Sequence, residues 1–394
     1  MLLSFSLIIL IGFALKGVFE KLKLPGLLGM LLAGILLGPH LLNLISSEIM
    51  DVSADLREIA LIVILTRVGL SLDLKDLKRV GRPALLMCFV PATLEILAAV
   101  ILAPLFFDIT YVEAALMGSI LAAVSPAIVV PKMLHLMESG YGRKNSIPQL
   151  ILAGASVDDI YVIILFTSFL GMTRGQSFNP ATVLQIPLSI ISGLVIGLLI
   201  GYLLVRLFKL LHVRDTVKVL LILGLSFGIM GLDASINQIF PFSGLLAVIA
   251  ISGAILKFYE PLARRLTGKF SKIWVAAELL LFVMLGAVVD IGQIRGSGLL
   301  LIVIIAAGLV LRSLGVFICV LRTKLSRNER VFCAIAYLPK ATVQAAIGAL
   351  PLAAGVASGS LILTAAVLAI LICAPLGSIG IEMTYKRLLE RHQA

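Results

Sequence analysis

Apolar stretches of roughly 20 residues recur along almost the whole chain, separated by short polar or Pro/Gly-rich breaks. A stretch of that length spans the hydrocarbon core of a bilayer as an α-helix. Of the 394 residues, 60% are hydrophobic and only 13% are charged, whereas an ordinary soluble domain is about 25% charged. The sequence therefore predicts an all-α polytopic membrane protein and excludes a soluble domain with a single anchor.

The apolar runs predict thirteen transmembrane helices. The first run lacks a basic segment and a small-residue cleavage site, so we interpret it as a membrane helix and not as a secretory signal. The expected spans are 2–19, 25–44, 57–73, 82–107, 112–136, 147–171, 184–211, 215–236, 242–258, 272–290, 298–321, 329–351 and 357–385.

Positive charge is distributed unevenly between the loops. With the N-terminus outside, 26 of the 32 Lys and Arg residues fall in or beside inward loops and the C-terminal tail, and only Arg57, Arg174 and Arg295 in outward loops. This asymmetry predicts an outside N-terminus and a cytoplasmic C-terminus. It also explains the net charge of +11, so no nucleic-acid partner is expected.

The two halves of the chain resemble each other. Three pairs of segments match, and each partner lies seven spans from the other, so the partners run in opposite directions: 25–38 with 242–256, 56–74 with 276–291, and 125–131 with 338–344. Chance similarity of apolar sequences is the alternative, but three pairs at one spacing favour an inverted six-helix repeat. The expected domains are a first repeat (1–171, helices 1–6), a linker helix 7 (172–211) and a second repeat (212–394, helices 8–13).

Proline interrupts one span in each half, at Ser125-Pro126 and at Leu338-Pro339. Proline removes a backbone donor and bends or breaks a helix, and the freed groups must then find partners or line a wet cavity. Inverted repeats with broken helices in matching positions are typical of secondary transporters, whose site lies near mid-membrane.

Two adjacent acids, Asp158 and Asp159, lie inside an apolar run whose other residues, from 147 to 171, carry no charge. Unpaired and ionised, the two would together cost roughly 5–7 kcal/mol at the bilayer centre. Burial and a nearby like charge both favour the protonated carboxyl form, and a small cation can displace that proton. A site that holds either a proton or a cation produces exchange, so both acids are the predicted ion and proton ligands.

The other charges inside predicted spans are weaker indications of a functional role. Glu95 and Arg312 can form a buried ion pair, either as a structural latch or as part of the charge balance of transport. Lys340 lies in the second broken span, where it can snorkel or stabilise helix ends. The candidate supporting ligands Ser125, Thr342 and Gln344 offer oxygens to an ion or satisfy freed backbone groups.

Arg67 and Glu278 lie in repeat-related spans and are expected to be structural core charges. The four histidines show no HExxH or similar ligand spacing. The cysteines lie in apolar segments without a CxxC pair and are expected to be core residues: Cys88, Cys319, Cys333 and Cys373. No cofactor and no enzymatic activity are expected.

The chain resembles the cation:proton antiporter superfamily, specifically its NHA-type sodium/proton antiporters with paired aspartates. The resemblance rests on ILTRVGLSLD (64–73), AAVSPAIVVPKML (122–134), GASVDDI (154–160) and LPKATVQAAIG (338–348). It implies thirteen helices and a homodimer, with a dimer domain of helices 1, 2, 8 and 9. A core domain of helices 3–6 and 10–13 would move elevator-like, with Asp159 as chief ligand beside Asp158.

One departure concerns Arg312, because many paired-aspartate relatives have a lysine there. Arginine does not release its proton, and by analogy Arg312 is expected to pair with Glu95 and leave Asp158 freer. One-for-one exchange is then at least as well supported as two-proton exchange.

The favoured function is Na⁺ or Li⁺ exchange for H⁺ in a bacterial inner membrane, with pH homeostasis as its purpose. K⁺/H⁺ exchange, K⁺ efflux and a passive cation channel are the alternatives. A channel is disfavoured because both acids lie on one helix and an inverted repeat suits alternating access.

Overall fold

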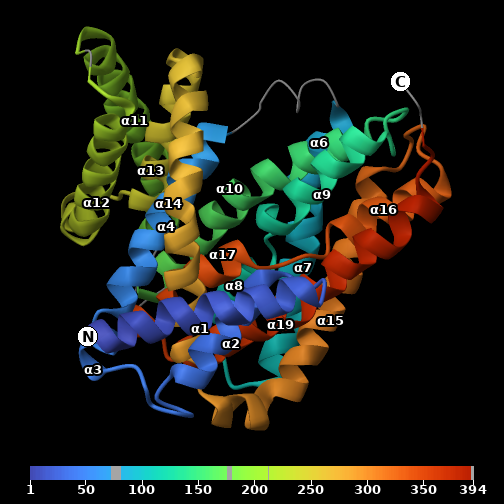
Figure 1. The fold of residues 1–394 in the computed structure, drawn as a ribbon, viewed down its shortest axis with the longest axis horizontal. Helices are drawn as coiled ribbons and strands as arrows, with labels where there is room; N and C mark the ends of the chain where they lie inside the picture. The colour runs from blue at the N-terminus through green and yellow to red at the C-terminus, as the bar shows by residue number, and fades with distance from the viewer. Residues whose placement is uncertain (72–80, 175–179, 212, 392–394) are drawn as a thin grey trace. The chain divides into compact units, whose positions relative to one another are not determined.

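A computed structural model describes residues 1–71, 81–174, 180–211 and 213–391, and this part of the chain is helical and contains no strand longer than an isolated bridge (Figure 1). Within it, nine helical segments are long and apolar enough to cross a membrane. Shorter apolar helices cover 26–37, 244–258 and 342–353. The predicted class, an all-α polytopic membrane protein, is confirmed, and the total of thirteen crossings stays a prediction.

Each expected span has a helix or a helix pair as its counterpart in the described residues. The helices are α1 (Leu2–Lys21), α2 (Gly26–Leu37), α3 (Ser47–Asp51), α4 (Ser53–Ser71), α6 (Arg82–Met87), α7 (Val90–Phe106), α8 (Tyr111–Leu121), α9 (Pro126–Ser139), α10 (Ile147–Arg174), α11 (Pro180–Leu210), α12 (Asp215–Ile239), α13 (Gly244–Phe258), α14 (Glu260–Ala287), α15 (Ile291–Cys319), α16 (Arg327–Ala336), α17 (Thr342–Ile347), α18 (Leu350–Ala353) and α19 (Gly359–Leu388). Residues 72 and 73 of the ILTRVGLSLD motif lie outside the described residues.

Two helices differ from their expected bounds. The second span was expected to reach 44, but α2 ends at Leu37, because Gly38 and Pro39 follow and the residue before a proline disfavours helical backbone. The tenth span was expected to begin at 272, but α14 begins at Glu260. The first turns of α14 carry many charged residues, so a search for apolar runs does not detect them. These turns are still helical because Glu, Lys and Arg are good helix formers.

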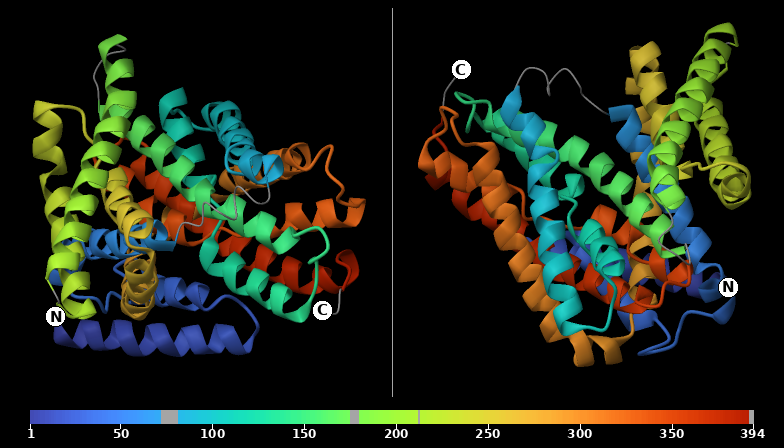
Figure 2. Two further views of the ribbon diagram at one scale, coloured as in Figure 1. Left: turned by 90° about the horizontal axis from the view of Figure 1, so that it is seen from above. Right: turned by 180° about the vertical axis from the view of Figure 1, so that it is seen from behind.

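The chain forms two compact units, of which the first comprises 1–54, 73–169 and 282–394. In this unit α7 packs along α15 and also against α8, and α19 packs against α15 and α16 (Figure 2). The second unit comprises 55–72 and 170–281. There α11 packs closely on α13, because Gly193, Gly197 and Gly201 leave room for the α13 backbone.

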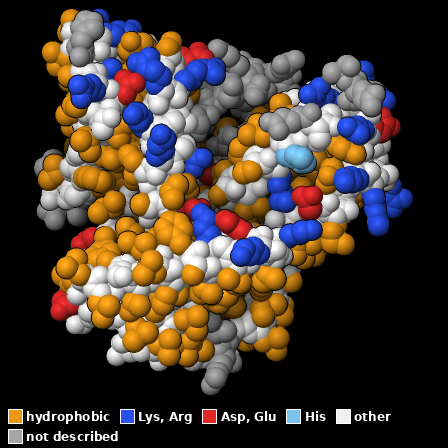
Figure 3. Space-filling view, viewed as in Figure 1, with side chains coloured by type: hydrophobic (Ala, Val, Ile, Leu, Met, Phe, Trp, Pro, Cys, Tyr) orange, Lys and Arg blue, Asp and Glu red, His pale blue; other side chains and the backbone are white. Residues whose placement is uncertain are grey.

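Large apolar side chains remain exposed on the outer helices, as expected for surfaces that face lipid. Examples are Leu2 (88% exposed) and Leu3 (75%) on α1, and Leu299 (76%) on α15. Hydrophobic side chains gather over α1 and α15 in the space-filling view (Figure 3). Exposed apolar surface of this extent indicates contact with a membrane.

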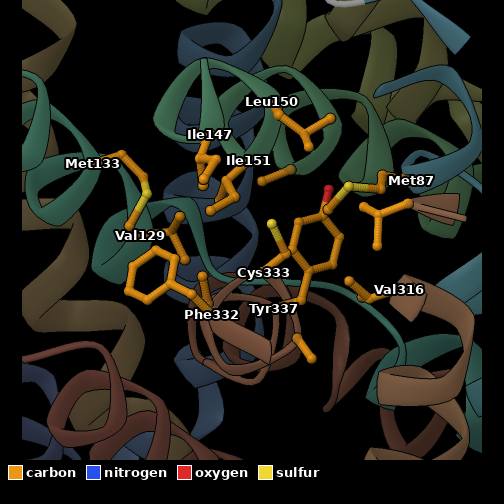
Figure 4. Close-up of a cluster of buried hydrophobic side chains, with 14 of the residues drawn as sticks. Met87, Val129, Met133, Ile147, Leu150, Ile151, Val316, Phe332, Cys333 and Tyr337 are labelled. Carbon is orange, nitrogen blue, oxygen red and sulfur yellow. The ribbon is translucent and has the colours of Figure 1, made fainter. Parts of the chain in front are cut away.

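A buried cluster around Tyr337 joins helix ends of the first unit (Figure 4). It includes Met87 from α6, Met133 from α9, Ile151 from α10 and Phe332 from α16, all essentially inaccessible to solvent. The four cysteines are buried and free, as core residues should be. This cluster fixes the ends of the helices that carry the polar site.

Candidate functional site

Two interrupted helices meet in the first unit. The helix α8 ends at Leu121 and α9 begins at Pro126, while α16 ends at Ala336 and α17 begins at Thr342. The backbone N–H of Ser125 donates to the carbonyl of Pro339 at 2.8 Å, which ties one break to the other. The interruptions therefore occur where the two proline pairs predict them.

The last carbonyls of α8 are satisfied by side chains instead of by a further helical turn. Gln344 Nε2 donates to the carbonyls of Ile120, at 3.0 Å, and Ala123, at 2.9 Å. Lys340 Nζ donates to the carbonyl of Leu121, and Arg312 Nη1 to that of Ala122. The end of a helix carries partial negative charge, so two cations and an amide at this position stabilise the break.

The two aspartates lie on α10 beside the first break, and Asp158 is 0% and Asp159 2% exposed. Asp158 Oδ2 accepts a hydrogen bond of 2.9 Å from the backbone N–H of Val124 and one of 3.1 Å from Arg312 Nη2. In the described part of the chain, the Oδ1 atoms of both aspartates have no hydrogen-bond partner. Each acid thus retains a buried oxygen that can accept a proton or a cation.

Arg312 connects both acidic helices. Its Nη1 lies 2.9 Å from Glu95 Oε2 on α7, and its Nη2 lies 3.1 Å from Asp158 Oδ2 on α10. The expectation that Arg312 pairs with Glu95 and leaves Asp158 freer is therefore wrong for Asp158. The planar guanidinium carries five donors and can contact both carboxylates at once.

Glu95 also contacts a second cation, because Lys340 Nζ lies 2.8 Å from it. Both side chains are buried, Lys340 at 0% and Glu95 at 2% exposed. The interpretation of Lys340 as a snorkelling residue is wrong, since its ammonium group ends in this buried cluster. Its interpretation as a residue that stabilises a helix end agrees with its bond to Leu121.

The three predicted supporting residues also carry buried oxygens without hydrogen-bond partners in the described part of the chain. Among the residues that the structure describes, these are Ser125 Oγ, Thr342 Oγ1 and Gln344 Oε1. Because the Gln344 amide nitrogen already donates to carbonyls, its oxygen is the end left for an incoming group. Buried polar atoms are nearly always hydrogen-bonded, so this concentration of unpartnered oxygens indicates a place for an exogenous ligand.

Arg67 and Glu278 are the two other charges that the sequence places in the core. They belong to the second unit, on α4 and α14, where their opposite charges interact. Such an interaction agrees with their expected structural role.

Sequence reasoning missed the backbone groups of the site and one side chain. The N–H of Val124 and the carbonyls of residues 120–123 leave no trace in a residue pattern. The Tyr337 side chain was also missed. Its ring centre lies 5.4 Å from Arg312 Cζ, and the Tyr337 carbonyl accepts a 2.8 Å hydrogen bond from Arg312 Nε. A usable signal was its position at the end of a broken helix, where carbonyls lack helical donors.

Comparisons with known proteins agree with this architecture. The profile of the family described as "Sodium/hydrogen exchanger, transmembrane" matches residues 5–387. The chain is 32% identical over 385 residues to sodium/hydrogen exchanger 9B2 of Homo sapiens, a match that covers 93% of this chain and 70% of the relative. It is 31% identical over 396 residues to sodium/hydrogen exchanger 9B1 of Homo sapiens, covering 94% and 73%.

A solved structure shares the fold. The sodium proton antiporter MjNhaP1 of Methanocaldococcus jannaschii superposes with a TM-score of 0.79 at 20% identity, covering 98% of this chain and 97% of that one. The length of the family match and the identity to the exchanger relatives lead to one conclusion: the chain belongs to the sodium/hydrogen exchanger family.

Proposed function

We propose that this protein exchanges Na⁺ or Li⁺ for H⁺ across a membrane, with cation and proton competing for Asp158 and Asp159. The observation that carries the proposal is the pair of buried acids whose Oδ1 atoms have no hydrogen-bond partner among the described residues. The names of the exchanger relatives and of the solved antiporter support it. The reaction is transport, so no enzymatic step is involved.

The chemistry of the site supports competition between the two ions. A small hard cation prefers carboxylate, hydroxyl and carbonyl oxygens, and Ser125, Thr342 and Gln344 offer such atoms at the two helix breaks. An ionised carboxylate out of water is costly unless a proton or a cation compensates it. When the cation leaves, a proton must therefore replace it, and this requirement couples the two flows.

The charges of the buried cluster support one-for-one exchange. Three acids (Glu95, Asp158 and Asp159) face two bases (Arg312 and Lys340). When all are ionised, the cluster carries one excess negative charge, which a single proton or a single Na⁺ neutralises. Arg312 stays charged, and the Lys340 ammonium group is paired with the Glu95 carboxylate. Each half-cycle then moves a neutral cluster, so the membrane potential does not drive the exchange.

The wider architecture follows the sequence predictions and stays part of this proposal. Inverted repeats at 1–171 and 212–394, joined by a linker helix (172–211), place the site between two halves. The core domain comprises the third to sixth and the tenth to thirteenth predicted spans, and the dimer domain comprises the first, second, eighth and ninth. The core domain moves against the dimer domain in an elevator-like cycle within a homodimer. The N-terminus lies outside and the C-terminus in the cytoplasm of a bacterium, where exchange at the inner membrane serves pH homeostasis.

The direct test uses proteoliposomes with an imposed pH gradient. Addition of Na⁺ or Li⁺ dissipates the gradient with the native protein and leaves it intact with Asp159→Asn. Asp108→Asn is the matched control, because Asp108 is exposed in the α7–α8 loop and the same chemical change there leaves exchange at the native rate. Clamping the membrane potential with K⁺ and valinomycin leaves the Na⁺-driven rate unchanged if exchange is one-for-one.

Three outcomes would overturn the proposal. Asp159→Asn protein that exchanges at the native rate would remove the acid from the mechanism. Dissipation by K⁺ as fast as by Na⁺ and Li⁺ would identify a K⁺/H⁺ exchanger, and cation flux without proton movement would identify a channel.

A further inference from the structure

Two buried glycines occupy matching places in the two halves of the chain, Gly69 near the end of α4 and Gly286 near the end of α14. In the sequence each is followed four residues later by an aspartate, Asp73 or Asp290. We propose that both glycines are pivots on which the core domain turns against the dimer domain. The inference rests on the proposed exchange function and assigns its conformational step to particular residues.

The backbones of α14 and α2 touch each other at Gly286. A Cβ atom at Gly286 would collide with the carbonyl oxygen of Leu31. It would also lie 2.9 Å from the backbone nitrogen of Ile35 and 3.1 Å from Gly34 Cα. The helix α2 supplies a glycine of its own here, because a Cβ atom at Gly34 would collide with the carbonyl oxygen of Val283. Only glycine therefore fits at 286 without a shift of backbone.

The other half of the chain repeats this contact between α4 and α13. A Cβ atom at Gly69 would lie 2.5 Å from the carbonyl oxygen of Ile249. It would also lie 2.6 Å from Ser252 Cβ and 3.2 Å from the backbone nitrogen of Gly253. In both halves the neighbours are a carbonyl oxygen, a carbon atom three residues further on, and a backbone nitrogen four residues further on. A repeated structure explains this agreement better than chance packing does.

Both contacts join a helix of the proposed core domain to a helix of the proposed dimer domain. The helices α4 and α14 correspond to the third and tenth predicted spans, and α2 and α13 to the second and ninth. Each compact unit of the chain contains one of the two contacts.

A contact that both halves share has a particular meaning in alternating access. Inverted repeats alternate by exchanging their conformations, as one part rocks against the other. A contact present in one half alone is made and broken in each cycle, whereas a contact present in both halves is kept in both states. When such a contact joins a moving part to a stationary one, the motion turns on it.

Glycine suits a pivot because it has no side chain to interlock with the ridges and grooves of the opposite helix. Its Cα–H groups can also approach a carbonyl oxygen closely. The methyl group of an alanine must lie to one side of the opposing carbonyl, and the helices can then turn only if it passes over that carbonyl. Such a variant is held in one orientation, so exchange slows although the ion site is intact.

The test compares exchange with ion binding in Gly286→Ala and Gly69→Ala. Binding of radioactive Na⁺ to the purified protein counts the intact sites and gives their Kd, and proton flux in proteoliposomes gives the exchange rate per site. We expect this rate to fall by roughly tenfold or more, with a native Kd for Na⁺. The larger loss is expected for Gly286→Ala, because its methyl group meets backbone atoms only. A variant that is merely less stable loses sites, but each remaining site exchanges at the native rate.

Two glycines of the same helices provide matched controls. A Cβ atom at Gly268 on α14 or at Gly253 on α13 would meet no atom of the described residues within 4 Å. Gly268→Ala and Gly253→Ala therefore make the same change in helix propensity without obstructing either contact. Both controls should exchange at the native rate per site.

A distance measurement decides the question if neither alanine variant at the pivots folds. Ile59 on α4 and Phe258 on α13 are 42% and 41% exposed, so both positions accept spin labels after substitution by cysteine. The four native cysteines are buried and are shielded from the label. Pulsed electron paramagnetic resonance in proteoliposomes should give two distances between the labels, one for each orientation of α4 on α13. A single distance would contradict a pivot at Gly69.

Native exchange per site in both Gly286→Ala and Gly69→Ala would overturn the pivots, and so would equal slowing in the two controls. These results leave the proposed exchange intact, because that function is tested separately by loss of exchange in Asp159→Asn.

Discussion

Two aspartates of this protein each lie beside an arginine, and the difference between them is instructive. Asp215 Oδ2 lies 2.8 Å from Arg265 Nε and Oδ1 lies 3.3 Å from Lys218 Nζ, and its side chain is 23% exposed. Asp158 has no exposed surface, and only Oδ2 has partners in the described structure. Both carboxylate oxygens of Asp215 have charged partners, and the side chain is partly exposed to solvent. Asp158 is shielded from solvent, and its Oδ1 remains available to a ligand.

The two aspartates are expected to differ in their contribution to stability as well as in function. An exposed ion pair contributes little because water and salt screen it. A buried pair is different, because removal of one partner leaves a charge without compensation. Three substitutions, one in the Asp158 cluster, one in the adjacent break and one at Asp215, measure this difference.

The largest effect is expected for Glu95→Gln. Arg312 and Lys340 then remain buried without the carboxylate that both contact. We expect a loss of about 3–5 kcal/mol in the free energy of unfolding, measured by denaturation of the purified protein in detergent. A loss no larger than that of Asp215→Asn would show that the buried cluster contributes no more to the free energy of unfolding than the exposed one.

A smaller effect is expected for Gln344→Met, which keeps the shape of the side chain but removes its amide. The carbonyls of Ile120 and Ala123 lose their donor, at a cost of about 1–3 kcal/mol. The same denaturation assay without Na⁺ checks the value. Native stability in this variant would mean that the break is satisfied by other groups.

The smallest loss in the free energy of unfolding, below about 1 kcal/mol, is expected for Asp215→Asn. Because the Asp215 pair is partly exposed, the difference from the native protein shrinks as choline chloride is added. Denaturation at low and high choline chloride measures this without supplying Na⁺. A salt-independent loss as large as that of Glu95→Gln would erase the contrast between the two clusters.

The course of the chain was largely predictable from sequence, because apolar length alone identifies membrane helices. The prolines at 126 and 339 also located both breaks. Helix ends were less predictable. The first turns of α14 are charged, so hydropathy does not detect them, and α2 stops at Leu37 although apolar residues continue beyond Pro39.

The site was predictable only in part. Asp158 and Asp159 stand out because an ionised acid in an apolar run is costly. The contacts of Arg312 with Asp158 and of Lys340 with Glu95 join residues more than 150 positions apart, and residue types alone do not specify which acid each base meets. The roles of Val124 N–H and of the Tyr337 ring depend on backbone position and packing, which residue types do not encode.

Occupation of the same acids by a proton and a cation in turn is the basis of the proposed exchange. It is tested most directly by adding Na⁺ to concentrated, weakly buffered protein in detergent at a pH where the site is protonated, with choline as the control ion. The native protein should release about one proton for each Na⁺ bound, and Asp159→Asn should release none. Binding of Na⁺ to the native protein without proton release would contradict the account.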